Sequence, residues 1–224
     1  MLTIPPPQLR NPWGTQKWTG PFSDADPGGR WTPRLRKAVG FTPSIEGRSE
    51  KTGVFWMELS DFLREFESLY VCRLFRTVER GGPWHKRSVA GGWSTAGGTA
   101  GGYRAAATEP QLRVAGLQRP AQLFATLTLD HGANKGGAGG EDPVYIGLFL
   151  LEAPAGGGRA RSTGRGQVAA STPFTNMPTV SVAVTRLEVR AGGYLLLPTT
   201  FKAGTERPWT ITVFADGPFE LESI

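Results

Sequence analysis

Few side chains of this 224-residue chain could act as nucleophiles or metal ligands. Cys72 is the single cysteine, and it sits inside the apolar run Tyr70–Leu74, which favours a structural thiol over a nucleophile. One cysteine excludes an internal disulfide framework and a Cys-rich zinc site. The two histidines, His85 and His131, argue against a metal site built from histidine alone.

The second chemical feature is the short motif Asn11-Pro12-Trp13. Pro12 restricts the backbone of Asn11 to an extended conformation, which helps to aim the amide side chain. In isolation, an Asn-Pro pair starts a turn and a Trp beside it anchors a core. The motif therefore needs its context before any chemistry can be assigned to it.

Composition bounds the class of protein and its partners. The net charge is +6, but the arginines are scattered through Gly-rich stretches such as 158–161, with no helix of interleaved basic and aromatic residues. We expect no nucleic-acid partner and no attachment to a membrane surface. The longest apolar run, Val144–Leu151, is too short to span a bilayer, and Met1–Arg10 does not read as a signal peptide. The cysteine usage favours an intracellular, cytoplasmic location.

The first part of the chain reads as ordered loops with little regular structure. Residues 1–45 are dense in Pro, Gly and Trp, with one short helical turn expected at Leu35–Val39. Val54–Met57 is a β-prone run. Ser60 is a plausible N-cap for a helix that carries Phe62, Leu63, Phe66 and Leu69 on one stripe, and Tyr70–Leu74 then reads as a strand.

From about residue 110 onward the pattern predicts an antiparallel β-sandwich. The fold class is therefore α+β and mostly β. Residues 79–110 are Gly-rich and form the expected boundary, whereas 136–140 and 155–166 read as flexible surface loops. The predicted strands are short, lie between Gly/Pro turns and comprise Leu123–Leu129, Val144–Leu151, Val180–Val184, Tyr194–Pro198 and Thr210–Phe214.

The ordered set of motifs resembles a calpain-type cysteine protease. It is similar to the second half (the C-terminal lobe) of the papain-like calpain core followed by the calpain-type β-sandwich. The resemblance implies an Asn-bearing lobe at 1–76, a linker at 77–83 and a sandwich at 84–224. The motifs that carry it are Leu9–Gly14, Trp18–Gly20, Phe22–Asp24, Trp31, Gly53–Met57, Asp61–Phe66, Val71–Leu74, Gly92–Trp93, Thr99–Arg104, Glu109–Gln111 and Gly193–Phe201.

The resemblance implies thiol catalysis, in which a Cys attacks the peptide carbonyl and a His moves the proton. Asn11 maps onto the residue whose side-chain oxygen orients that His, and Trp13 onto the wall that shields it. The nucleophilic Cys and the His of the family lie upstream, but only ten residues precede Asn11 and none is Cys or His. We expect a partial chain of a calpain-like endopeptidase that is inactive alone and acts on protein substrates when the missing lobe completes it.

Calcium is expected from the family, but its ligand positions are degraded here. Those positions hold Lys17, Asp24, Thr52 and Val54, and only Asp24 keeps a carboxylate. Since Ca²⁺ takes six to eight oxygen ligands, several of them charged, we expect no cofactor in this chain. Asp24 is the one remaining candidate ligand, and a turn or capping role suits it better.

Two other functions remain open. The chain could be a non-catalytic calpain homologue whose sandwich acts as a binding or scaffolding module, as the lost calcium ligands favour. The segment Leu112–Gln122, which holds Arg113, Arg119 and no acid, could meet anionic lipid or an acidic partner. An unrelated all-β binding domain would require the whole ordered set of motifs to arise by chance.

Overall fold

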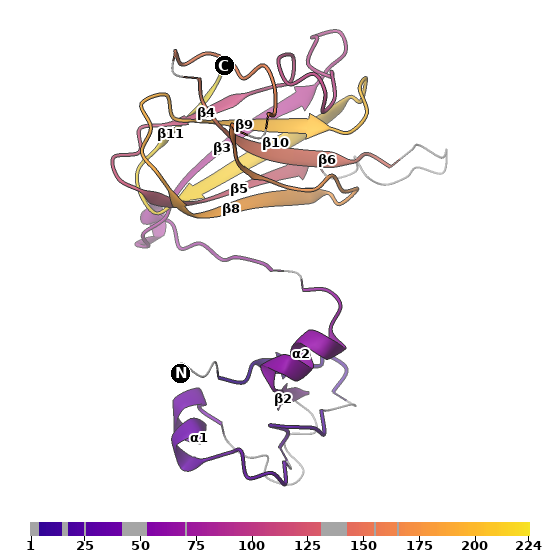
Figure 1. Ribbon diagram of the computed structural model, residues 1–224, viewed down its shortest axis with the longest axis vertical. Coiled ribbons are helices and arrows are strands. Elements are labelled where there is room, and N and C mark those ends of the chain that lie inside the picture. The colour runs from indigo at the N-terminus through magenta and orange to yellow at the C-terminus, as the bar shows by residue number, and fades with distance from the viewer. Residues whose placement is uncertain are drawn as a thin grey trace. The chain divides into compact units, whose positions relative to one another are not determined.

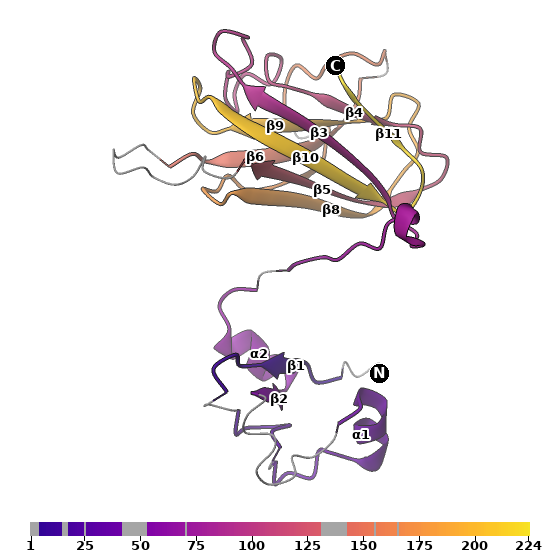
Figure 2. The same cartoon turned by 180° about the vertical axis from the view of Figure 1, so that it is seen from behind.

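The computed structural model describes residues 5–14, 18–24, 26–41, 53–69, 71–130, 143–154, 156–164 and 166–224. It divides into two compact units, unit 1 at Met1–Arg73 and unit 2 at Leu74–Ile224 (Figures 1 and 2). Lys17, Thr52, His131 and the glycine run at 136–140, all named in the sequence predictions, lie outside the described residues.

Unit 1 is a small assembly of two strands and two helices. Strands β1 and β2 pair antiparallel, with Leu9 opposite Phe55. The first helix is longer than the predicted turn because Pro33 supplies its first residue, the side chain of Thr32 accepts the N–H of Leu35, and Gly40 ends it in the left-handed conformation. The elements are β1 (Gln8–Arg10), α1 (Pro33–Val39), β2 (Val54–Trp56) and α2 (Leu59–Glu65).

The start of α2 differs from the prediction that Ser60 caps it. Glu58 has extended backbone angles and occupies the N-cap position, without a side-chain cap, so the helix begins at Leu59 and Ser60 lies inside it. Asp61 sits in the first turn and pairs with Arg64 at 2.6 Å, which anchors this end through an ion pair in place of a hydroxyl cap.

The strand predicted at Tyr70–Leu74 is wrong for the residues that the structure describes. Residues 71–74 form no ladder, and the Leu74 side chain is 93% exposed. Cys72 is exposed as well, so it is not the buried structural thiol that its apolar neighbours suggested. A β-prone segment becomes a strand only when another strand supplies the hydrogen bonds, and none of the described strands pairs with this one.

Unit 2 is an antiparallel sandwich, which confirms the mostly β fold class. One sheet has the order β3-β10-β5-β8, and the other has the order β11-β4-β9-β6-β7. A 3₁₀ turn, η1, precedes them. The bounds are η1 (Val78–Arg80), β3 (His85–Trp93), β4 (Leu112–Ala115), β5 (Ala121–Leu129), β6 (Ile146–Glu152), β7 (Val168–Ser171), β8 (Thr179–Leu187), β9 (Tyr194–Thr200), β10 (Arg207–Ala215) and β11 (Glu220–Ser223).

The core of unit 2 follows from the alternation of its strands. In β5, Leu123, Leu127 and the residues between them at every second position are buried, and Ile211 and Val213 of β10 continue the same face. Strand pairing sets Leu127 opposite Ile211, so the two apolar faces form one layer. This layer packs against Leu148 and Leu196 of the other sheet in a single cluster.

The sequence pattern did not predict β3, and it predicted β9 too short. β3 lies in the Gly-rich region that was expected to be a boundary. Gly91 makes room there for the Trp209 ring, because a Cβ at Gly91 would stand 2.5 Å from atoms of that ring. β9 runs past Pro198 to Thr200 because β4 pairs only with 194–196. Pro198 therefore needs no donor on that side, and its carbonyl accepts the Trp93 indole N–H at 3.2 Å.

The glycine-rich segment 155–166, predicted as a flexible loop, is tied to the sandwich in its described part. Gln111 is buried, and its amide accepts the N–H of Ala160 at 2.8 Å and donates to the carbonyls of Ala160 and Ala106. Ala160 itself is buried and joins Leu195 and other apolar residues outside the main core. The segment therefore covers the outer face of the five-stranded sheet.

The region predicted as a linker folds as part of unit 2. Thr77 bridges to Trp84 around the η1 turn, and the indole of Trp84 contacts Phe75 and Phe124. Phe75 also stacks on Phe214 of β10, with ring centroids 4.2 Å apart. These aromatic contacts fix the chain at Phe75 onto the four-stranded sheet.

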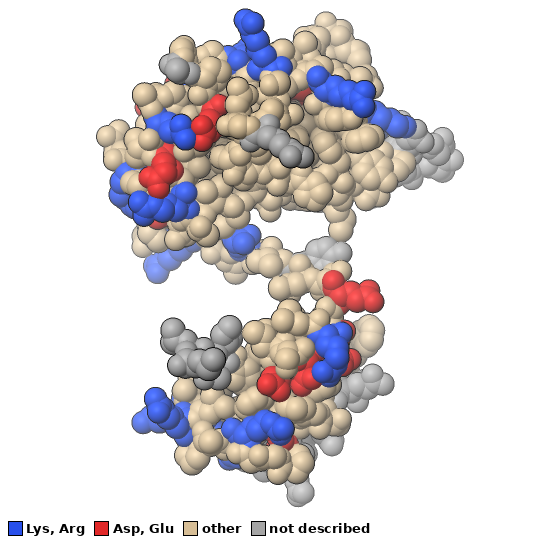
Figure 3. Space-filling model, viewed as in Figure 1, with Lys and Arg blue, Asp and Glu red and all other residues tan. Residues whose placement is uncertain are grey.

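Basic side chains are dispersed. On the face seen in Figure 3, Lys and Arg lie in separate groups over unit 2, with no continuous stripe of the kind a nucleic-acid backbone follows. Among the described residues, no helix is long and apolar enough to cross a membrane.

Glu109 is a fully buried carboxyl in unit 2. Its Oε1 accepts the N–H of Gly102 at 2.8 Å, whereas Oε2 has no hydrogen-bond partner among the described residues. Burial raises the pKa of Glu109 above its ordinary value, and the hydrogen bonds that the carboxylate accepts oppose this rise.

Replacing Glu109 by Gln should change how stability depends on pH. Between the ordinary Glu pKa of 4.5 and the raised native pKa, the native state binds more protons than the unfolded state, so wild-type stability falls as pH rises through that window. Glu109→Gln should lack this fall, which urea unfolding at a series of pH values measures. The matched control Glu222→Gln, at an exposed position of β11, should keep the wild-type slope. A parallel profile for Glu109→Gln and wild type would contradict the assignment.

Candidate functional site

A pocket of about 420 Å³ opens in unit 1 beside the end of β1. Phe55 and Met57 are buried in its wall, and Trp18 and Phe66 contribute aromatic surface. Asn11 lies on the same wall, directly after the last residue of β1. The pocket is mostly apolar and places one amide side chain at its edge.

Backbone bonds fix the position of Asn11. Its N–H donates to the carbonyl of Gly53 at 2.8 Å, and its carbonyl accepts the N–H of Gly14 at 3.1 Å. The side-chain Oδ1 accepts the N–H of Trp13 at 3.0 Å, which closes a turn over Pro12. An amide oxygen can accept two hydrogen bonds.

Trp13, predicted as the wall of an active site, is 84% exposed and is not among the residues that line the pocket. Its role beside a catalytic His stays a prediction. Trp18 lines the pocket, with its indole N–H bonded to the Pro21 carbonyl at 2.8 Å. Trp18 stood in the motif set, but no spacing rule pointed to its role.

The other candidates for chemistry lie elsewhere. Cys72 and His85 are absent from the described lining of the pocket, and His85 belongs to β3 of unit 2. Arg10 and Glu65 add one positive and one negative side chain to the lining. The described lining therefore presents Asn11 and Glu65 as acceptors for an N–H donor such as an imidazole, and it holds no thiol or hydroxyl nucleophile.

Gly53 is a positioning residue that sequence reasoning left without a role. Its φ is +64°, and a Cβ there would stand 2.0 Å from the carbonyl oxygen of Asn11. Only glycine accommodates both the backbone angle and this close approach. Its place immediately before the β-prone run Val54–Met57 was the signal available in the sequence.

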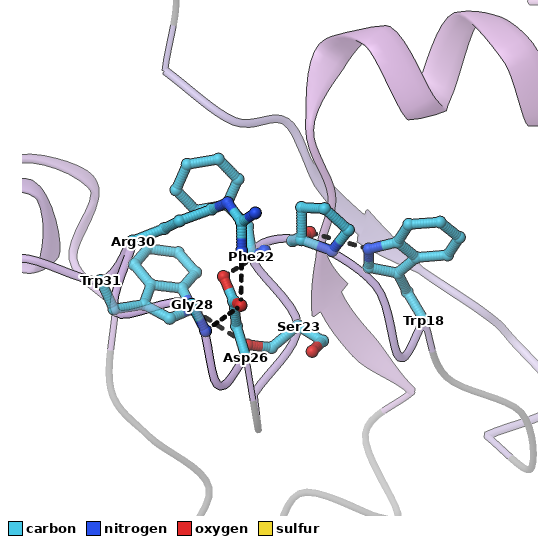
Figure 4. Close-up of polar contacts among 8 residues, drawn as sticks. Trp18, Phe22, Ser23, Asp26, Gly28, Arg30 and Trp31 are labelled. Atoms are coloured by element: carbon cyan, nitrogen blue, oxygen red, sulfur yellow. Dashed lines mark hydrogen bonds and ion pairs between the residues drawn. The ribbon is translucent and has the colours of Figure 1, made fainter.

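Asp26 organises the loop after Trp18 (Figure 4), and the turn or capping role predicted for Asp24 stays a prediction. Asp26 accepts the N–H groups of Phe22 at 3.0 Å and Gly28 at 2.8 Å and pairs with Arg30 at 2.8 Å. The N–H bond from Phe22 is the main cause that lowers the pKa of Asp26. These bonds hold Phe22 at φ +62°, and its ring packs edge-on against Trp31.

The described residues do not fit a calcium site. Asp24 is half-buried, and the Val54 side chain in β2 has no oxygen. Within the part of the chain that the structure describes, no three His, Cys, Asp or Glu side chains are grouped so as to hold a metal ion. The carboxylate oxygens of Asp26 are taken by backbone N–H groups and Arg30. Calcium therefore enters no step proposed below.

Replacing Gly53 by Ala should loosen Asn11. The added methyl group collides with the Asn11 carbonyl, so we expect hydrogen exchange at the Asn11 amide, followed by NMR, to become at least about tenfold faster. The control is Gly29→Ala, which also has positive φ (+62°) but meets no atom within 4 Å. Gly29→Ala introduces only the backbone strain of a positive φ, about 1–2 kcal/mol, and should leave the Asn11 amide protected from exchange. Equal protection in the two variants would count against this role for Gly53.

Both units are similar to parts of known proteins. Residues 7–73 match the model of the calpain family cysteine proteases. Over 97% of its length, the chain is 32% identical to the calpain-type cysteine protease DEK1 of Zea mays and 30% identical to that of Arabidopsis thaliana. It is 26% identical to calpain-9 of Rattus norvegicus over 93% of its length.

The matched region is a small part of these relatives. The chain spans 10% of the length of the two plant proteins and 31% of calpain-9. Since the matches run through unit 1 and continue across the sandwich, both units contribute to the likeness. The chain is therefore similar to calpain-type cysteine proteases in both units.

Proposed function

We propose that this chain forms part of a calpain-like cysteine endopeptidase, in which Asn11 orients the imidazole of a catalytic His. The observation that carries the proposal is the placement of Asn11 at the edge of an apolar pocket, on a backbone fixed by Gly53. The His and the nucleophilic Cys would come from polypeptide outside residues 1–224.

In the proposed reaction, the Cys thiolate attacks the peptide carbonyl carbon and forms a C–S bond. The imidazolium then protonates the leaving amine as the C–N bond breaks, and water hydrolyses the acyl-enzyme with the imidazole as base. Asn11 Oδ1 accepts the imidazole N–H throughout, which keeps the ring aimed at sulfur. Trp13 would cover this hydrogen bond and exclude water from it.

The apolar surface of unit 1 supports a larger assembly around this site. Trp13 is 84% exposed, and Leu63 and Leu69 are each 70% exposed. Where such exposed apolar side chains form a contiguous patch, they commonly mark a surface that further polypeptide covers. The proposed protein substrates would bind only after this cover is in place.

Asn11→Ala tests the proposal when the full chain is mixed with the Cys- and His-bearing portion of a calpain relative. We expect peptidase activity from the wild-type mixture and a loss of about 10²-fold in Asn11→Ala, because an unaimed imidazole is misplaced for proton transfer. Hydrolysis of a fluorogenic peptide measures the rate.

Cys72→Ser is the control, and it should keep the activity of the wild-type mixture, since Cys72 lies outside the pocket lining. Activity of Asn11→Ala equal to wild type would exclude the orienting role. A wild-type mixture that assembles and stays inactive would favour the non-catalytic homologue.

We also propose that the family's calcium positions in this chain confer no calcium response. Addition of Ca²⁺ should leave the thermal unfolding midpoint of the full chain unchanged, because Lys17, Thr52 and Val54 supply no carboxylate. The restoring variant Lys17→Glu/Thr52→Asp/Val54→Glu should gain a calcium-dependent rise. A rise in the wild-type protein that chelation reverses would contradict this.

The alternative is a binding or scaffolding module, and the completeness of unit 2 favours it. Two sheets enclose a continuous core that includes fully buried Leu123, Ile146 and Ile211. Such a unit meets the burial requirement of a domain that folds alone. The assembly experiment above separates the two functions.

A further inference from the structure

Unit 2 holds a second pocket, of about 700 Å³, bordered by the glycine-rich segment that follows β6. The segment runs from Pro154 through Ser162 along one side, and Ala107 and Gln167 complete the lining. Gln111 ties this segment to the sandwich through Ala160, so the lining is held in place. The volume lies in the range of small-molecule sites.

Two arginines line this pocket, and a third lies beside its glycine-rich wall. Arg159 and Arg161 line the pocket. The terminal nitrogens of Arg113 lie 3.5 and 3.6 Å from where a Cβ on Gly157 would stand, and Gly157 separates two glycines of the lining. The Nε of Arg113 is buried and has no hydrogen-bond partner among the described residues. A buried, unsatisfied N–H on a cation favours an anionic acceptor.

Among the described residues, neither Arg161 nor Arg113 forms an ion pair. Arg159 donates to the carbonyl oxygens of Ala107 and Glu109 and to an oxygen of Ile224, so its donors are already engaged. The printed sequence from 153 to 167 holds three arginines and no Asp or Glu. Glu152, just before it, is paired with Arg190 at 2.5 Å.

The remaining lining suits an oxyanion. A Cβ added at Gly156 or Gly158 would meet no atom within 4 Å, so the backbone is open to close approach by a ligand at both positions. Ser162 adds a hydroxyl donor beside Arg161. Guanidinium forks, a hydroxyl and bare glycine backbone are all groups that bind phosphate.

We propose that this pocket binds the phosphate group of a small soluble phosphorylated molecule. Arg161 and Arg113 supply the charge-assisted hydrogen bonds, and Ser162 donates a neutral one. The hydrogen bonds of Arg159 to Ala107, Glu109 and Ile224 hold the loop in place. The site lies wholly in unit 2 and is independent of the proposed peptidase role.

The test titrates the full chain with inorganic phosphate and with myo-inositol hexakisphosphate at constant ionic strength. Calorimetry gives the affinity, and NMR follows the amides of Gly156, Gly158 and Ser162. We expect shifts at these amides and a loss of affinity of about tenfold or more in Arg161→Gln, with a smaller loss in Ser162→Ala.

Arg186→Gln is the matched control. It removes the same charge from an exposed position of β8, where Arg186 pairs with Glu188, and should change the affinity less than twofold. A further variant, Arg113→Gln, tests the arginine whose Nε is buried. If it fails to fold, Arg161→Gln decides, because Arg161 is exposed and makes no contact that the fold requires.

Three outcomes would overturn the proposal. The first is equal loss in Arg161→Gln and Arg186→Gln, which indicates diffuse attraction to a basic surface. The second is the absence of shifts at the three amides. The third concerns phosphatidylcholine vesicles that carry a phosphoinositide. If the protein binds these vesicles and soluble hexakisphosphate does not displace it, the ligand is a lipid surface. Displacement at the affinity measured in solution supports the phosphate group itself as the recognised element.

Discussion

The close approach of two backbones, at Asn11 and Gly53, is the constraint on which the geometry of unit 1 depends. It joins the end of β1 to the start of β2, so the turn that carries the Asn11 amide and the strand that lines the pocket are fixed by one contact. Since the contact requires the absence of a Cβ and a positive φ, it is specified by one residue type. The position of Asn11, and with it the candidate chemistry of the unit, therefore depends on the glycine at position 53.

Unit 2 is held by a different kind of interaction. Its apolar core arises from strand alternation, but the cover over the outer face of the five-stranded sheet depends on the Gln111 amide, which joins the segments around Ala106 and Ala160. A buried amide with all of these bonds formed specifies one arrangement of loops that apolar packing alone would leave variable. The pocket beside Arg161 is a consequence of that arrangement, because the same segment forms its wall.

The sequence predicts what depends on local pattern and misses what depends on a partner. Alternation located β5 and β10, and the ordered motifs placed Asn11 beside a candidate site. Pattern alone could not show that Gly91 admits the Trp209 ring, or that 71–74 would find no strand to pair with. Asp26 was missed for the same reason: its neighbours in sequence look alike, and only the fold shows which carboxylate meets the N–H groups of Phe22 and Gly28.

The unequal burial of the two units bears on how the chain could work. Among the described residues of unit 1, Trp31, Phe41 and Trp56 form a small buried cluster and Phe55 and Met57 are buried in the pocket wall, while Trp13 and Leu69 stay exposed. A unit with so small a core gains stability when further surface covers its apolar side chains. The sandwich has no such need, since its core is enclosed by its own two sheets. Unit 1 therefore has the properties of a part that gains from being covered by further polypeptide, and unit 2 those of a unit that encloses its own core.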